Sequence, residues 1–139
     1  MIESLHVASG AAAGAALRSR TAAVVAGPVL HILGDLIPHQ DIASRGFEVG
    51  SGVLGVLFVA ARRGPTDAAT IGALAASAPD IEHVVKLPRP GGRKLFPSHR
   101  LPGWHRPGGV PAWAQLLAAG ALLGMVLSAP IPSGAGSPP

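Results

Sequence analysis

The chain carries six histidines and seven carboxylates, and most of them fall into a few short stretches. An ionised carboxylate buried among apolar groups is costly unless it is paired or coordinates a metal. A largely apolar chain that keeps its few acids beside its histidines is therefore expected to build one polyvalent site, and a divalent cation is the simplest occupant. The candidate metal ligands are His6, His31, Asp35, His39, Asp80, His83, His99 and His105.

The stretch from His31 to His39 carries three of these candidates at intervals of four residues. Residues four apart lie on one face of a helix, so His31, Asp35 and His39 would form one stripe. Eight residues of helix rise by about 12 Å, which is too long for one ion to contact all three side chains. Either the helix breaks near Pro38, or His39 serves the site indirectly or binds a second ion. The alternative is a buried His31–Asp35 hydrogen bond without metal, and Asp41 is expected to be a solvated turn residue.

A second stretch contains Asp80, Glu82 and His83. If a helical turn starts there, the interval of three places Asp80 and His83 on the same side, where they can share an ion. Glu82 would then point elsewhere or act as a general base. The alternative is that Asp80 caps a helix and His83 is a surface residue.

The segment from Lys86 to Gly109 is a long loop rich in proline and glycine. Such a loop in a compact domain is usually functional or disordered. It carries His99 and His105, each followed by an arginine. Arg100 and Arg106 add charge that suits an anionic or phosphate-bearing substrate, whereas loop histidines are otherwise usually exposed and inert.

The composition bounds the class of protein. Hydrophobic residues make up 48% of the chain and charged residues 13%, and that charged share is about half that of an ordinary soluble domain. The absence of cysteine excludes disulfides and thiolate zinc sites. The net charge is +4, but the basic residues are dispersed, which fits anionic lipid headgroups better than nucleic acid. We therefore expect membrane lipid as a partner and no nucleic acid.

Five apolar segments are expected to be helical, and no strand-like alternation competes with them. A bilayer span needs about 20 apolar residues, which the second and fifth segments reach and the third approaches. The fifth segment contains no charged residue, which argues against an ordinary globular bundle without metal. The segments are 6–17, 21–38, 46–61, 66–78 and 111–129.

The sequence thus predicts an all-α fold, a small transmembrane or membrane-associated bundle of about five helices. Residues 1–129 would form one domain with a Pro/Gly-rich loop at 84–110, and residues 130–139 a disordered tail. If the helices run alternately up and down, the start of the first, the ends of the second and fourth, and the long loop meet at one end. Every histidine is then expected near that end. Four arginines are expected at the other end, namely Arg18, Arg20, Arg62 and Arg63.

Two motifs also carry a resemblance. Residues 79–83 read Pro-Asp-Ile-Glu-His, and residues 96–100 read Phe-Pro-Ser-His-Arg. Together with His6 and the stretch from His31 to His39, they resemble motifs of the bacterial membrane-bound metal-dependent hydrolase family, which is distantly similar to zinc-dependent phospholipase C. The resemblance spans about residues 6–106 and rests on short motifs.

The resemblance implies an integral protein of the bacterial inner (cytoplasmic) membrane with a zinc site built from His and Asp. Bound zinc would lower the pKa of a water molecule toward about 7. Glu82, where the family usually has Asp, would serve as general base, with Asp41 as the alternative. Arg100, Arg106 or Lys94 would hold a phosphoester or a lipid-derived substrate. The alternative function is non-catalytic, an integral membrane scaffold or partner protein with a structural His/carboxylate site. The sequence leaves the oligomeric state open.

Overall fold

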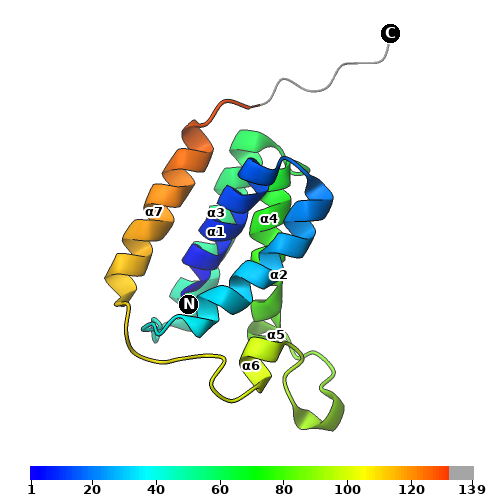
Figure 1. Ribbon diagram of the computed structural model, residues 1–139, viewed down its shortest axis with the longest axis vertical. Helices are drawn as coiled ribbons and strands as arrows, with labels where there is room; N and C mark the ends of the chain where they lie inside the picture. Colours follow the sequence, from blue (N-terminus) through cyan, green and yellow to red (C-terminus); the bar gives the residue numbers. More distant parts are fainter. Residues whose placement is uncertain (132–139) are drawn as a thin grey trace.

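A computed structural model describes residues 1–131, and every regular element within them is helical. Five long helices form the bundle (Figure 1), as the sequence predicts, with bounds close to those expected. The predicted tail covers residues 130–139. Only its first two positions are among the described residues, and 132–139 lie outside them. The long helices are α1 (Glu3–Leu17), α2 (Arg20–Leu36), α3 (Arg45–Arg63), α4 (Ala68–Ser77) and α7 (Ala112–Ser128), and the short ones are η1 (Ala78–Asp80), α5 (Ile81–Val84), η2 (Pro90–Gly92) and α6 (Pro97–Arg100).

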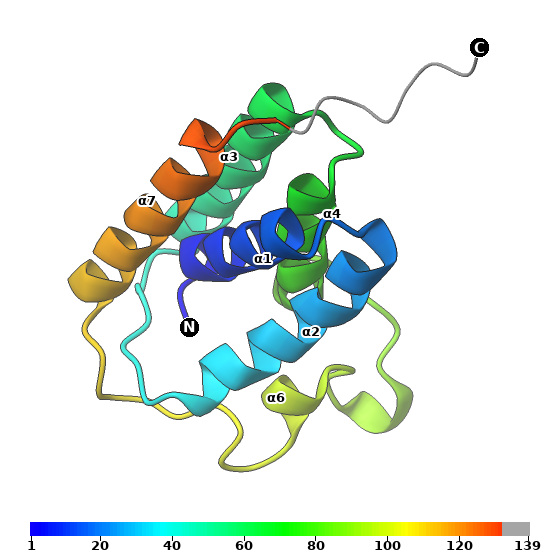
Figure 2. The ribbon, with the colours of Figure 1, turned by 45° about the horizontal axis from the view of Figure 1, so that its top comes forward.

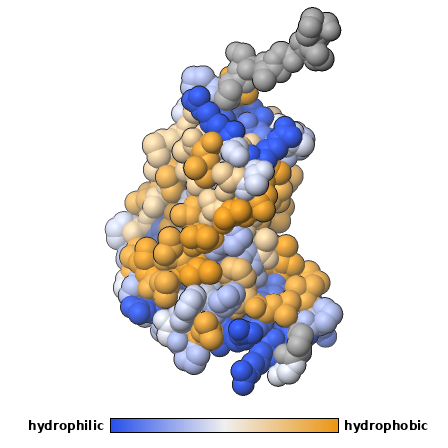
Figure 3. Space-filling view, turned by 45° about the vertical axis from the view of Figure 1, so that its right-hand side comes forward, coloured by the Kyte–Doolittle hydropathy of each residue, from blue (hydrophilic) through white to orange (hydrophobic). Residues whose placement is uncertain are grey.

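The membrane part of the sequence prediction is wrong. Among the helices of residues 1–131, none is both long enough and apolar enough to cross a bilayer. The most apolar candidate, α7, has 17 residues, short of the roughly 20 that a span needs. The longer α3 has 19 residues but begins at Arg45, contains Glu48 and ends with Arg62 and Arg63. The predictions of a transmembrane bundle and of an integral inner-membrane location are therefore wrong, and the all-α bundle remains. Hydrophobic residues nevertheless cover much of the middle of the face shown in Figure 3.

The central helix is α1, which contacts α2, α3, α4 and α7 (Figures 1 and 2). Apart from Glu3 and His6, its residues are apolar or small, which suits a helix that has neighbours on most sides. Val7 and Ala11 of α1 are fully buried and pack in one cluster with Val59 of α3 and Val126 of α7. The position of α1 in the middle fixes where the ends of the surrounding helices meet.

The helices α1 and α4 approach until their backbones touch. A Cβ atom added at Gly10 would lie 2.2 Å from the carbonyl oxygen of Gly72, and one added at Gly14 would lie 2.0 Å from that of Ala68. Only glycine leaves room for this approach. The contact runs along most of both helices, so it also fixes the start of α1 beside the end of α4.

Backbone hydrogen bonds join the end of α2 to the end of the long loop. The helix ends at Leu36, just before Pro38, and the chain turns away from the helix axis there. The His39 N–H donates to the carbonyl of Arg106 at 3.1 Å, and the Val110 N–H donates to the carbonyl of Pro38 at 2.9 Å. The helix therefore breaks before His39, which is the first of the two alternatives that the sequence left open.

Gln115 of α7 joins three further segments and is 2% exposed. Its Oε1 accepts from the Ile2 N–H at 3.1 Å. Its Nε2 donates to the carbonyls of Gln40 at 2.8 Å and Val110 at 3.1 Å. A single amide thus holds the start of α1, the segment after α2 and the start of α7 in register.

The contact between α1 and α4 can be tested with Gly10→Ala. The added methyl group must displace backbone, so we expect the free energy of unfolding to fall by about 1–3 kcal/mol. Gly120→Ala in α7 is the matched control, because no atom lies within 4 Å of its added Cβ and the change improves helix propensity by up to ~1 kcal/mol. Denaturant titration followed by circular dichroism measures both. Equal stability of Gly10→Ala and the wild type would contradict the close contact.

Candidate metal centre

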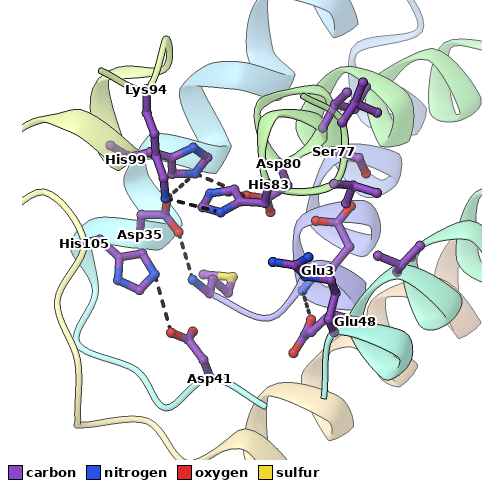
Figure 4. Close-up of a pocket in the computed structure, with 18 of the residues that line it drawn as sticks. Glu3, Asp35, Asp41, Glu48, Ser77, Asp80, His83, Lys94, His99 and His105 are labelled. Carbon is purple, nitrogen blue, oxygen red and sulfur yellow. Dashed lines mark hydrogen bonds and ion pairs between the residues drawn. The ribbon is translucent and has the colours of Figure 1, made fainter. Parts of the chain in front are cut away.

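One end of the bundle collects chemically active side chains from seven parts of the chain, and Figure 4 shows most of them around a cavity. Helix alternation predicted that the histidines would gather at one end of the bundle, and this prediction is confirmed. Arg18, Arg20 and Arg63 lie together elsewhere, around a separate small hollow. The roles of the gathered residues as metal ligands stay predictions. The cluster consists of His6 from α1, His31 and Asp35 from α2, His39 and Asp41 from the segment after α2, Asp80 from η1, His83 from α5, His99 from α6 and His105 from the long loop.

The inner part of the cluster consists of His31, Asp35, Asp80 and His99. The Nε2 atom of His31 lies 3.2 Å from Asp35 Oδ2 and 3.8 Å from Asp80 Oδ1. The Nε2 atom of His99 lies 3.2 Å from Asp80 Oδ1 and 3.7 Å from Asp35 Oδ2. The two Nε2 atoms are 3.3 Å apart. The donor atoms of His31, Asp35 and His99 therefore lie within 4.8 Å of one another and face one point, and Asp80 lies beside the two imidazoles.

The opposite nitrogens of the same two rings are held by groups that only accept hydrogen bonds. His31 Nδ1 donates to the carbonyl of Ala76 at 2.9 Å, and His99 Nδ1 donates to Glu82 Oε1 at 2.6 Å. With the proton on Nδ1, each neutral ring presents an Nε2 lone pair to the common point. Two lone pairs cannot bond to each other, so the arrangement needs a cation there, either a proton on one ring or a metal ion. Metal-binding histidines are oriented in this way.

Further buried atoms at this point lack hydrogen-bond partners. They are both ring nitrogens of His6 and Oδ2 of Asp35. His6 stacks on His31 with ring centroids 3.9 Å apart, and its Nε2 lies 3.3 Å from Asp35 Oδ1. Buried polar atoms are normally hydrogen-bonded. Their donor chemistry, imidazole nitrogen and carboxylate oxygen, fits zinc or a similar divalent cation.

The pKa shifts show how charge is distributed in the cluster. Burial would raise the pKa of Asp35, but the facing nitrogens of His31 and His6 outweigh it and hold that pKa below its usual range. Burial lowers the pKa of His6 to about 4, so this ring is neutral at pH 7. Burial alone would lower the pKa of His99, but Asp80 and Glu82 raise it. Among these rings, His99 is therefore protonated more readily than His6.

Glu82, the predicted general base, lies behind His99 and is 3% exposed. Its Oε1 accepts from His99 and from the Phe96 N–H at 3.2 Å, and its Oε2 accepts from the Leu95 N–H at 2.6 Å. Both oxygens are thus used in orienting His99 and in fixing the loop that carries it. The role of general base stays a prediction, and the geometry favours a positioning role instead.

The outer part of the cluster consists of His39, Asp41 and His105, together with Asp35. His39 Nδ1 donates to a backbone carbonyl at 2.7 Å, and its Nε2 faces His105 Nε2 at 3.2 Å and Asp41 Oδ1 at 3.0 Å. The amino nitrogen of Met1 lies 2.8 Å from Asp35 Oδ1 and also contacts His39 Nε2. Asp41 is 53% exposed, as expected of a turn residue, but it contacts both histidines. Asp35 is shared by the inner and outer parts.

The remaining predicted residues lie at the rim. His83 is partly exposed, with Nε2 3.7 Å from Asp80 Oδ1 and its ring 4.2 Å from that of His99. Lys94 Nζ lies 3.3 Å from His83 Nδ1. Arg100 is exposed and lines the cavity. Its predicted role in holding substrate is untested.

Sequence reasoning missed Glu3 and Glu48, which line the same cavity (Figure 4). Glu48 Oε2 accepts from the Glu3 N–H at 2.7 Å. Burial, followed by the contact with Asp80, raises the pKa of Glu3 to about 9. Glu3 precedes His6 by three residues, the interval that also separates Asp80 from His83, and this spacing could have identified it. Glu48 has no histidine within six residues, so no spacing in the sequence could have identified it.

Comparisons with protein-family models, with curated proteins and with solved structures returned no match to this chain. The resemblance to the membrane-bound metal-dependent hydrolase family therefore stays a prediction. The partners inferred from composition also stay predictions.

The raised pKa of Glu3 predicts a pH dependence of stability. The pKa of Glu3 is about 9 in the folded protein, whereas its ordinary value is 4.5. Between pH 4.5 and pH 9 the folded state therefore binds more protons than the unfolded chain, so stability falls as pH rises through that range. We expect Glu3→Gln to have a higher melting temperature than the wild type at pH 8 and a shallower decline from pH 5 to pH 8. Thermal melts in EDTA measure this, and identical pH profiles would contradict it.

Proposed function

We propose that this protein is a metal-dependent hydrolase that binds one divalent cation at His31, Asp35 and His99, beside Asp80, and cleaves a phosphoester. The observation that carries the proposal is the anchoring of two imidazoles by their Nδ1 atoms, which directs both Nε2 atoms at a buried carboxylate. Zinc is the expected ion, because the donors are imidazole nitrogens and carboxylate oxygens.

An open side of the cluster supports catalysis over a purely structural role. Structural zinc sites are closed by four protein ligands, whereas catalytic sites keep one position for water or substrate. Here Asp35, Asp80, His99 and His105 all line a cavity of about 970 Å³. A substrate in that cavity would reach the same side chains that hold the cation.

A bound cation of this kind supplies an activated water molecule and polarises a phosphoryl oxygen. The protein's own groups supply the rest of the chemistry. Asp41 and His83 lie at the rim, where they can accept or return a proton, and Arg100 and Lys94 can pair with phosphate oxygens. The reaction adds water across a P–O bond, so the water oxygen joins phosphorus, the alcohol leaves with a proton, and no redox partner is needed.

One observation favours a second candidate function, a structural cation. His99 and His105 lie on the long loop but contact residues of α2 and of the segment after it. A cation shared between loop and bundle would fix residues 84–110 without any turnover. Metal content and activity together separate the two candidates.

Metal binding is tested by loading the purified protein with zinc, removing loosely bound ion and measuring metal content by mass spectrometry. We expect about one tightly bound ion per chain, and its loss in His31→Ala and in His99→Ala. Glu82→Gln should weaken zinc affinity by about 10- to 100-fold, because the orienting acceptor of His99 is impaired. Arg100→Ala is the control and should retain the ion. Unchanged zinc content in both folded histidine variants would rule out this site.

Catalysis is tested with 4-nitrophenyl phosphate and bis(4-nitrophenyl) phosphate. We expect zinc-loaded protein to release 4-nitrophenol, chelation to abolish this and zinc to restore it. Arg100→Ala should raise KM more than it lowers kcat, since the arginine pairs with phosphate in the ground state as well. Tight zinc binding that raises the melting temperature, without turnover of either ester, would favour the structural candidate.

A further inference from the structure

The cavity beside the candidate metal centre is larger than a small phosphoester requires. Its volume is about 970 Å³, at the top of the usual range of about 300–1,000 Å³ for ligand pockets. One end is formed by Asp35, Asp80 and His99, and the rest extends along α3, α4 and α5. At ~30 Å³ for each non-hydrogen atom, the space holds about 30 such atoms.

The wall away from the metal centre is apolar and comes from three separate helices. It includes Leu57 of α3, Leu74 of α4 and Val84 of α5, which are 57%, 48% and 53% exposed. Single exposed apolar residues are ordinary on protein surfaces. Here, however, half-uncovered side chains from three helices converge on one hollow, and this hollow continues into the polar cluster. That continuity indicates a ligand with one polar end and one apolar end.

Basic residues line the same cavity: Lys94 and Arg100 come from the loop segment that carries His99, and Arg45 begins α3, where Glu3 and Glu48 also line the cavity. Arg45, Lys94 and Arg100 all line it, and none of the three forms an ion pair with a carboxylate within residues 1–131. Their charge complements an anionic group placed near Asp80 and His99 once a cation neutralises those carboxylates. The apolar wall carries no such charge. The polar end of the ligand is therefore the anionic end.

We propose that the substrate is a phosphoester of an alcohol with a long linear apolar chain, whose chain lies against Leu57, Leu74 and Val84. The position of the phosphate rests on the proposed function, whereas the site for the chain rests on the cavity itself. A phosphate and a chain of about eight to twelve carbons have roughly 13 to 17 non-hydrogen atoms and fit within about half of this volume. The hydrolase would therefore select its substrate by chain length as well as by head group.

A series of alkylphosphonates tests the proposal, because their P–C bond resists hydrolysis and binding can be measured alone. Ethyl-, butyl-, hexyl- and octylphosphonate are titrated calorimetrically into zinc-loaded wild-type protein, below micelle-forming concentrations. We expect the dissociation constant to fall with each added methylene, by up to about fourfold where burial is complete. A dissociation constant that is independent of chain length overturns the proposal.

Two leucines of α3 provide a matched pair of variants. Leu57 lines the cavity and Leu54 does not, although they are 57% and 55% exposed. We expect Leu57→Asn to weaken octylphosphonate binding by about tenfold and to leave ethylphosphonate binding unchanged, while Leu54→Asn changes neither. Circular dichroism confirms that both variants are folded. Equal effects of the two substitutions would place the chain elsewhere and overturn the proposal.

The two proposals fail in different ways. If 4-nitrophenyl phosphate is hydrolysed but octyl- and ethylphosphonate bind equally, the apolar site is wrong and the hydrolase proposal stands. If affinity rises with chain length but neither nitrophenyl ester nor octyl phosphate is hydrolysed, the apolar site stands and the hydrolase proposal is wrong.

Discussion

The burial of one carboxylate, that of Asp35, is the constraint on which this end of the molecule depends. Asp35 is 2% exposed, and an isolated charge in such a place would be strongly destabilising. Nitrogen atoms of His6, His31 and His99 surround this carboxylate, and these residues come from α1, α2 and α6. The packing of α1 against α2, and of α6 against the end of α2, therefore serves the electrostatics of a single side chain.

Much of this arrangement follows from the sequence. Apolar segments identified the five long helices, and helix alternation placed the histidine stretches at one end. The interval of four between His31 and Asp35 put both on one face of α2, where they meet at 3.2 Å. Pro38 predicted that the helix ends before His39, which allows the His39 ring to lie near Asp35. These features depend on local periodicity and on chain direction, which a sequence records.

Other features depend on tertiary contacts that no spacing records. The apolar character of the helices suggested a membrane, yet within the described residues no helix is long and apolar enough to span one, and many large apolar side chains lie exposed on the bundle. Small residues such as Gly10 and Gly72 let two backbones touch. The neighbours of Glu82 in the sequence suggested a general base, but hydrogen bonds from the loop at Leu95 turn it toward His99 Nδ1. Gln115 had no distinguishing neighbour at all, and its role emerges only where three segments meet.

The backbone contact between α1 and α4 has a consequence for ion selectivity. Since no side chain separates the two helices at Gly10 and Gly72, their spacing cannot adjust by rotamer changes, and His6 of α1 and Asp80, which follows α4, keep a nearly fixed separation on either side of His31. A cage of fixed dimensions discriminates by ionic radius. Zinc bonds to nitrogen and oxygen at about 2.0–2.2 Å, whereas calcium needs oxygen ligands at about 2.3–2.6 Å and a larger coordination number. Rigid helix packing would thus exclude the larger ion even when it is far more abundant.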